Sequence, residues 1–279
     1  MNRTLAAVAA SLLVVGCADR TAVSPLMPTQ PSPIVSGNPD QGAHPYVGLL
    51  VFDDAPGHPA WACTGSLLSS TVVLTAGHCT DGAVAARIWM DEVVQGNTQF
   101  PFGGTTSYEG SPHTNPGFCV FCTGNSILTL LSGDVGIVVL SEPVPANVVS
   151  TFVQLPTAGL VSTLPNGSTI QLVGYGDQVT LVGHGQPVTA GLLVRLKTNT
   201  TLISGNFFNS ENILRLSSTS SRDRGGACFG DSGSPNLVGN SNVTVGVVSF
   251  GTNHTCFGVN YTTRIDIPAI LSWIQSFLN

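Results

Sequence analysis

A serine hydroxyl that could act as a nucleophile lies near the C-terminal end of the sequence. Ser232 belongs to the segment CFGDSGSP, which spans residues 228–235. Glycine in such a turn permits unusual backbone angles, so the hydroxyl is exposed and the N–H groups of Gly230 and Ser232 can converge on a developing oxyanion. An oxyanion hole of this kind typically lowers a barrier by about 3 kcal/mol. The segment predicts a nucleophile with its oxyanion hole, and a plain Gly-Ser turn is the structural alternative.

A serine hydroxyl is a weak nucleophile at neutral pH, so it needs a base and a group that orients the base. The segment LTAGHC, residues 74–79, places His78 at the end of a β-rich run, where small neighbours leave room for the ring. The other five histidines lie in loop sequence rich in Gly, Pro and Thr and are expected on the solvated surface: His44, His58, His113, His184 and His254. His78 is therefore the predicted base.

An acid that could orient this base opens the apolar run DVGIVVL, residues 134–140. Such a continuous apolar run is typical of a buried strand, and a carboxylate buried at its start needs a partner. An imidazole N–H would satisfy Asp134, and the carboxylate would in turn fix the histidine tautomer and stabilise the imidazolium. A solvated aspartate in a turn is the alternative.

The elements that must position these residues are short β-rich runs bounded by Gly, Pro, Asn or Asp. These runs are residues 46–52, 71–75, 135–140, 169–173, 191–196 and 243–250. Their spacing predicts an all-β body, either barrels or a sandwich. Apolar residues between Ile267 and Leu278 fall at helical spacing, which predicts a short C-terminal helix with Asp266 as its N-cap and Pro268 in its first turn.

The strings TAGHC, DVGIVVL and GDSGSP, in the order His, Asp, Ser, resemble the chymotrypsin/trypsin family of serine proteases. Subtilisin-like enzymes and α/β-hydrolases order their triads differently. The segments IVSG, residues 34–37, and GYG, residues 174–176, resemble the family's mature N-terminus and its Gly-aromatic-Gly turn.

The resemblance implies two packed six-stranded antiparallel β-barrels with a short C-terminal helix. The serine protease domain would span residues 34–279, with barrels at about 34–150 and 151–266 and the helix at 267–279. The implied activity is that of a serine endopeptidase that acts through an acyl-enzyme, with no cofactor or metal. A catalytically inactive protease-like binding protein and a serine esterase are the alternatives.

The resemblance also assigns residues that bind the substrate. Ser249, Phe250 and Gly251 match the strand that pairs with the substrate backbone. Gly226 stands where trypsin-like members carry an aspartate, and Ala227 follows it, so the resemblance implies an uncharged pocket and cleavage after an apolar residue.

The depth of this pocket is left open by the sequence. Asn260 is an extra residue compared with the common Gly-Val-Tyr string, so either Gly258 or Val259 could face the pocket. Asp223 is the nearby acid that would reverse the preference if the loop register were shifted.

Seven cysteines leave one unpaired, and setting Cys17 aside leaves six, enough for three disulfides in an oxidising compartment. The resemblance implies the pairs Cys63–Cys79 and Cys228–Cys256. Cys119 and Cys122 remain, and we expect a small local disulfide between them. A redox or zinc motif is the alternative, although these two thiolates with His113 fall short of four ligands.

The N-terminal segment has the features of an export signal. Asn2 and Arg3 precede an apolar run over residues 5–15, and the string VVGC at residues 14–17 resembles the lipobox of bacterial lipoproteins. We therefore expect a signal peptide at residues 1–17 and lipidation at Cys17, with an ordinary signal peptide cleaved near Ala18 as the alternative. Residues 18–33 are rich in proline and predict a tether or a propeptide.

Activation is implied by the same resemblance, in which a new ammonium at Ile34 pairs with the buried Asp231 after cleavage. The bond that would be cut follows Pro33, an awkward site for most proteases, and Ser36 replaces the usual glycine. An active chain that stays tethered through Cys17 is therefore the alternative.

The composition limits the partners. Only 9% of the residues are charged, the net charge is −6, and Lys197 is the single lysine. This composition lacks the basic patch that a phosphate backbone requires, so nucleic acid is excluded as a partner. We expect a protein or peptide substrate, a secreted or lipid-anchored monomer, and membrane contact only through a lipid on Cys17.

Overall fold

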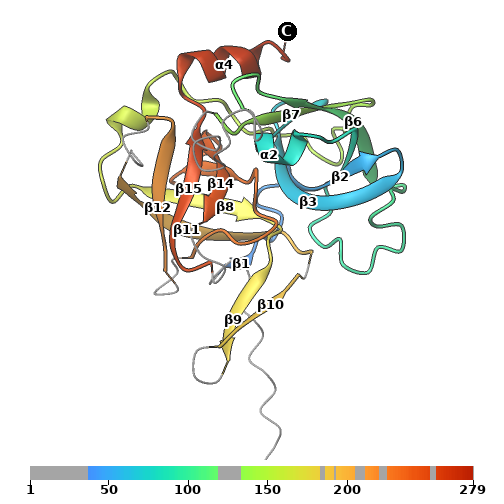
Figure 1. Ribbon diagram of the computed structural model, residues 1–279, viewed down its shortest axis with the longest axis horizontal. Coiled ribbons are helices and arrows are strands. Elements are labelled where there is room, and N and C mark those ends of the chain that lie inside the picture. Colours follow the sequence, from blue (N-terminus) through green and yellow to red (C-terminus); the bar gives the residue numbers. More distant parts are fainter. Residues whose placement is uncertain are drawn as a thin grey trace, which may run out of the picture. The chain divides into compact units, whose positions relative to one another are not determined.

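The computed structural model describes residues 37–118, 133–182, 186–191, 193–204, 211–219, 225–251 and 256–278 (Figure 1). All of them belong to one compact unit of the chain, residues 31–279, whereas the other unit, residues 1–30, lies outside the described residues. The predictions made for other residues also fall outside the described residues: Cys17, Ile34, Cys119, Cys122, His184, Asp223 and His254.

The first barrel is closed by six antiparallel strands in the order β2-β3-β4-β7-β6-β5. Its strands are β2 (Val47–Ala55), β3 (His58–Leu67), β4 (Val72–Thr75), β5 (Ala85–Trp89), β6 (Ser107–Thr114) and β7 (Gly136–Leu140). Leu50, Phe52, Ile88 and Val138 fill its core and have no exposed side-chain surface. The antiparallel pairing of β4 with β7 places the end of β4 next to the start of β7. His78 comes shortly after the end of β4, and Asp134 comes shortly before the start of β7.

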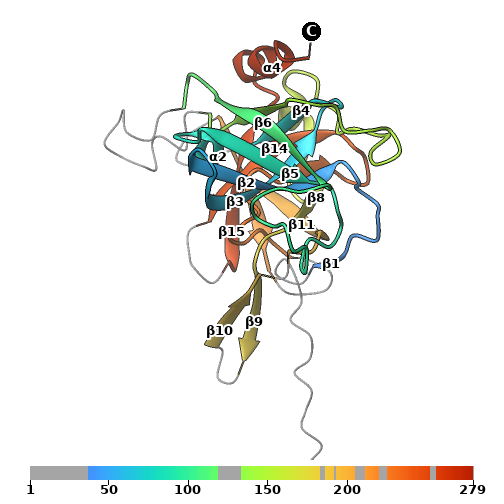
Figure 2. The same ribbon diagram turned by 90° about the vertical axis from the view of Figure 1, so that its right-hand side faces the viewer.

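The second barrel also has six antiparallel strands, and it closes because β8 pairs with both β13 and β11. Its strands are β8 (Thr169–Gly174), β11 (Leu196–Ser204), β12 (Ile213–Ser218), β13 (Pro235–Val238), β14 (Thr244–Gly251) and β15 (Gly258–Arg264). The short β1 (Asn38–Pro39) adds to β11. In the sequence, β9 (Gln178–Val182) and β10 (Gln186–Ala190) come between β8 and β11. They form a hairpin that projects from the second barrel in both views (Figures 1 and 2).

Among the described residues, three short helical segments accompany the barrels: α2 (Gly77–Thr80), the 3-10 turn η1 (Leu160–Thr163) and the C-terminal α4 (Pro268–Gln275). Ile270 and Ile274 of α4 pack with Leu74 and Ile137 of the first barrel and with Val247 of the second. The prediction of two six-stranded barrels with a short C-terminal helix is confirmed. Within the residues that the structure describes, no helix has the length and apolar character needed to span a membrane.

The predicted N-cap of the C-terminal helix is wrong. Ile267 occupies the N-cap position, and no side chain there accepts a hydrogen bond from the helix. The carboxylate of Asp266 instead accepts hydrogen bonds from the guanidinium of Arg264, at 2.9 Å, and from the N–H of Val161, at 2.9 Å. A buried carboxylate next to a guanidinium gains more from this charged partner than from a helix end that Pro268 already opens.

Candidate active site

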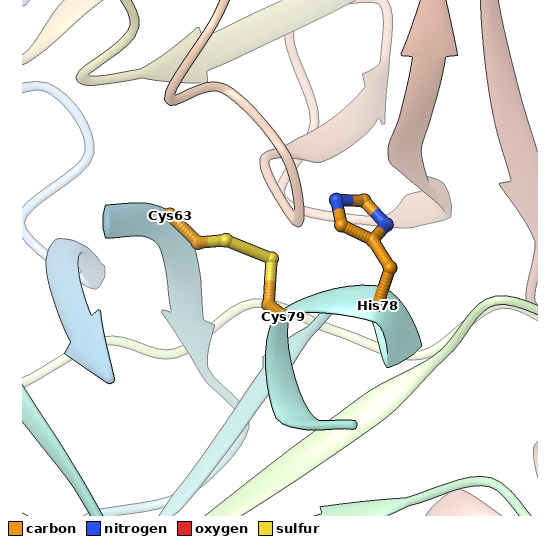
Figure 3. Close-up of side chains that lie close together, drawn as sticks. All are labelled: Cys63, His78 and Cys79. Carbon is orange, nitrogen blue, oxygen red and sulfur yellow. A yellow bond between two sulfur atoms is a disulfide. The ribbon is translucent and has the colours of Figure 1, made fainter. Parts of the chain in front are cut away.

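The His78 side chain is presented by α2, which begins directly after β4. Gly77 is needed there, because a Cβ at this position would lie only 2.9 Å from the backbone nitrogen of Val135. A disulfide between Cys63 and Cys79 ties α2 to β3 next to the histidine (Figure 3). This is the pairing that the resemblance implies, and it fixes the backbone from which the imidazole projects.

Asp134 binds this histidine twice. One carboxylate oxygen of Asp134, which is fully buried, accepts the backbone N–H of His78 at 2.7 Å, and the other lies 2.8 Å from Nδ1 of the ring. The hydroxyl of Ser249 also donates to the second oxygen. Because an ionised carboxylate only accepts hydrogen bonds, Nδ1 carries the proton and Nε2 is left as the basic nitrogen.

Two opposing effects act on the pKa of His78. Burial of the ring disfavours the charged form and would lower the pKa. The negative charge of Asp134 and its hydrogen bond to the ring act in the other direction and prevail, so the pKa of His78 is raised above its ordinary value of 6.5.

Ser232 lies in the turn that the sequence predicts. Gly230 and Gly233 have φ angles of +93° and +83°, which favour glycine at both positions. A Cβ at Gly233 would lie 2.1 Å from the hydroxyl oxygen of Thr75. This contact lets the turn of the second barrel lie directly against the first.

Two of the three predicted catalytic residues, His78 and Ser232, face a common cavity, and Asp134 is buried behind His78. Ser232 and Gly230 line a cavity of about 490 Å³ together with His78 and the aromatic residues Trp61 and Phe229. Within the described part of the chain, no hydrogen bond joins Nε2 of His78 to the Ser232 hydroxyl, an arrangement common in enzymes without bound substrate. Over the same residues, the N–H groups of Gly230 and Ser232 donate to no protein acceptor, so both remain available to an oxyanion.

Asp231, the residue before Ser232, is fully buried. Its carboxylate accepts the backbone N–H groups of Gly176, at 2.8 Å, and Cys228, at 2.9 Å. Burial raises the pKa of Asp231 to about 7 against the pull of these hydrogen bonds, and the nearby Asp177 adds to the rise. No cationic side chain among the described residues forms an ion pair with it.

A second cavity, of about 250 Å³, opens beside Ser232 between β14, β15 and the segment that carries the nucleophile. It is lined by Ala227, Cys228, Phe229, Ser232, Val248, Ser249, Phe250, Gly251, Cys256 and Asn260. Four of the predicted substrate-binding residues are in this lining, but Gly226 is not. A disulfide joins Cys228 to Cys256 at the edge of the cavity, as the resemblance implies.

Asn260 is the residue of β15 that lines this cavity, which the sequence left open. Its Oδ1 accepts the N–H of Ala227 at 2.8 Å, and its Nδ2 donates to the carbonyl of Ala227 at 3.1 Å. A Cβ at Gly226 would lie 2.4 Å from this Oδ1, so the glycine makes room for the carboxamide. Neither Gly258 nor Val259 is in the lining. The only signal in the sequence was the extra residue itself.

Two further polar contacts, one at the site and one elsewhere in the domain, were not foreseen. Ser249 was predicted only for its backbone, but a register shift between Val248 and Phe250 turns its side chain to Asp134. His44 was expected on the surface, which is wrong: it is 7% exposed, and its Nδ1 lies 2.5 Å from the buried Asp40. Loop sequence around a histidine does not reveal a buried carboxylate partner.

Comparison with known proteins gives concordant matches. The model of the Trypsin family matches residues 34–274. Chymotrypsin from Phaedon cochleariae is 26% identical over 235 residues, which are 83% of this chain and 77% of that protein. Serine protease 1 from Drosophila melanogaster is 43% identical over a shorter stretch of 56 residues, 20% of each chain.

Solved structures share the fold at lower identity. HL collagenase superposes with a TM-score of 0.63 at 20% identity, covering 84% of this chain and 94% of that one. Human heparin binding protein superposes with a TM-score of 0.62 at 20% identity, covering 88% of this chain and 97% of that one. With the family match over most of its length, the chain belongs to the trypsin family of chymotrypsin-like serine proteases.

Proposed function

We propose that this protein is an active serine endopeptidase in which His78, Asp134 and Ser232 form the catalytic triad. The observation that carries the proposal is the pair of hydrogen bonds from His78 to the buried Asp134, together with the cavity that His78 and Ser232 both line. An imidazole held in this way has one defined tautomer, with its basic nitrogen free to take a proton.

The proposed chemistry follows from these positions. Nε2 of His78 takes the proton of the Ser232 hydroxyl as the oxygen attacks the scissile carbonyl carbon. The electron pair of the carbonyl moves to its oxygen, which the N–H groups of Gly230 and Ser232 stabilise. The imidazolium then protonates the leaving amine as the C–N bond breaks. Water, deprotonated by the same imidazole, attacks the acyl-enzyme. The bond between the acyl carbon and the Ser232 oxygen breaks, and this oxygen takes the proton back from the imidazolium as the acid is released.

The decisive experiment is labelling with a fluorophosphonate probe, read by intact mass. We expect a stoichiometric adduct on wild type, none on Ser232→Ala, and a normal adduct on Ser234→Ala. Ser234 is a matched control, because its buried hydroxyl lies two residues from the nucleophile and makes no hydrogen bond among the described residues. No adduct on a folded chain that begins at Ile34 would favour an inactive binding protein.

The preferred substrate is proposed from the second cavity. Its described lining carries no charged side chain, and the wall residue Phe250 stacks on Tyr261 with ring centroids 4.7 Å apart. An uncharged cavity of this kind favours an apolar residue before the scissile bond. Hydrolysis of a library of peptides, compared with small esters, distinguishes an endopeptidase from an esterase.

Activation by cleavage before Ile34 is proposed on the evidence of Asp231. A carboxyl that is buried with a raised pKa gains stability from a cation, which a new ammonium would supply. Residues 18–33 would then be a propeptide, and cleavage would release the domain from a lipid on Cys17. N-terminal sequencing of the active form tests this, and an active chain that begins at Cys17 would show that cleavage is not required.

Export through residues 1–17 and a monomeric state are part of the same proposal. Two disulfides in the described part of the chain support an oxidising compartment outside the cytoplasm. Metabolic labelling with a fatty-acid analogue, on wild type and Cys17→Ala, distinguishes a lipid anchor from an ordinary signal peptide cleaved near Ala18.

A further inference from the structure

Thr64 of β3 holds the turn that carries Ser232 from across the junction of the two barrels. Its backbone N–H donates to the carbonyl of Ser232 at 2.8 Å, and its hydroxyl donates to the carbonyl of Gly230 at 2.9 Å. These are the carbonyl groups of the residues on either side of Asp231. One residue of the first barrel therefore contacts both ends of the segment that would form the oxyanion hole.

The hydroxyl of Thr64 is fixed in its direction. It accepts the backbone N–H of Tyr175 at 3.1 Å while it donates to Gly230, and the residue has no exposed surface. A hydroxyl that must both accept and donate cannot rotate without losing one of these bonds. The Thr64 side chain is thus a rigid bridge from the Gly-Tyr-Gly turn to the nucleophile turn.

The Thr64 bridge acts on Gly230, whose N–H would donate to the oxyanion. The carbonyl of Phe229 accepts the N–H of Asp177 at 2.5 Å, and because a trans peptide is planar, the N–H of Gly230 points the opposite way. Thr64 holds the next peptide through the Gly230 carbonyl. Glycine has the freest backbone of all residues, so Gly230, at φ +93°, keeps its orientation only if both neighbouring peptides are held.

We propose that Thr64 is a positioning residue for the reaction, and that its hydroxyl holds Gly230 so that the N–H of this residue faces the developing oxyanion. The inference rests on the proposed protease function. Thr64 acts through Gly230 and does not line either cavity of the site. The oxyanion carries more charge in the transition state than the substrate carbonyl does, so loss of the hydroxyl lowers kcat more than it changes KM.

The test compares wild type with Thr64→Val, Thr64→Ser and Thr244→Val in the mature, active protein. Thr244 is a matched control: it is also fully buried, and its hydroxyl donates to the Gly246 carbonyl at 2.8 Å and accepts the Asn236 N–H at 3.2 Å. On a peptide amide we expect Thr64→Val to lower kcat about 10-fold with KM within about twofold, less than loss of an oxyanion donor itself. We expect Thr64→Ser to retain most of the wild-type kcat and Thr244→Val to retain the wild-type kcat.

A second measurement separates positioning from a general loss of order. Affinity for a peptide boronate, which places an oxygen in the oxyanion hole, falls in Thr64→Val by about the same factor as kcat. Affinity for the matching product peptide stays unchanged. A Thr64→Val protein that retains the kcat and boronate affinity of Thr244→Val would overturn the role of Thr64.

Two further outcomes keep the tests distinct. If the Thr64→Val chain does not fold, Thr64→Ala removes the same hydroxyl without a second methyl group, and a wild-type kcat in that variant equally overturns the inference. A wild-type protein of verified N-terminus that neither hydrolyses peptides nor takes the fluorophosphonate would overturn the proposed function, and the role of Thr64 with it. An active wild type unaffected by loss of the hydroxyl contradicts Thr64 alone.

Discussion

At the scale of single residues, the proposed chemistry depends on a carboxylate that receives three hydrogen bonds. Asp134 accepts the backbone N–H and the Nδ1–H of His78 and the hydroxyl of Ser249. The hydrogen bond from the backbone N–H fixes the position of the His78 backbone, and the hydrogen bond from Nδ1 fixes the orientation of the imidazole ring. The same carboxylate raises the pKa of His78, so the base and its protonation state are set by one contact.

The pH dependence of activity follows from this contact. The imidazolium cannot take the serine proton, so kcat/KM rises with pH through the pKa of His78, which lies above 6.5. Asp134→Asn removes the negative charge that raises the pKa of His78, so the acid limb of the kcat/KM profile moves to lower pH. In the same variant kcat falls by about 10⁴-fold, because the tautomer of His78 is no longer fixed. Rate profiles from pH 5 to 9 measure both effects. An unchanged acid limb would show that another group controls it.

At the scale of elements, the second cavity is formed by the pairing of β14 with β15 and by the segment that precedes Ser232. The register shift in β14 turns the Ser249 hydroxyl to Asp134 of the first barrel, and Ser249 lines the cavity together with Phe250 and Gly251. Asn260 of β15 then bonds to both backbone groups of Ala227. A neutral carboxamide that a neighbouring strand supplies is therefore part of the cavity lining.

Specificity should respond to a charge at this position. Asn260→Asp keeps the size of the side chain but places a carboxylate in the lining of the cavity. We expect kcat/KM for substrates with Lys or Arg before the scissile bond to rise at least about 10-fold relative to Leu or Phe, because a buried carboxylate gains most from a paired cation. Competition assays with mixed peptides measure the ratio. Asn97→Asp, in an exposed loop, is the control, and an equal ratio in both variants would exclude Asn260 from recognition.

At the scale of the whole molecule, the site exists only where the two barrels meet. Thr64 of the first barrel holds the turn that carries Ser232 of the second, and α4 packs against both barrels. Asp231 is buried at this junction with a raised pKa. The stability of the described domain therefore depends on the protonation of a group that no described cation neutralises.

A pH-dependent stability is expected of the chain that is not cleaved before Ile34. Between about pH 4 and pH 7 the unfolded state releases the Asp231 proton while the folded state keeps it, so the free energy of unfolding falls as pH rises. The contribution is on the order of 4 kcal/mol. Urea unfolding of Ser232→Ala with and without Asp231→Asn measures it, because Asn does not titrate. Equal pH dependence in the two proteins would contradict this assignment.

The sequence by itself indicated the fold class and three candidate residues, His78, Asp134 and Ser232. The structure places these three residues near one another. Each lies in a short string whose neighbours dictate its local conformation: glycine permits the turn at Ser232, and an apolar run buries Asp134. Such information is local, so it can be obtained from adjacent residues. The alternation of short β-rich runs likewise indicates strands wherever it occurs.

Tertiary structure alone decided what surrounds these residues. The hydroxyl of Thr64 contacts Gly230 across 166 positions of sequence, and Asn260 contacts Ala227 across 33, so neither contact leaves a local pattern. Ser249 depends on a register shift of one residue, which sends alternate side chains to opposite faces of a strand. Asp266 binds Arg264 instead of capping the helix that its neighbours suggested. His44 lies against the buried Asp40 instead of in solvent. Burial makes such pairings strong, and burial is a property of the packed chain rather than of any segment of it.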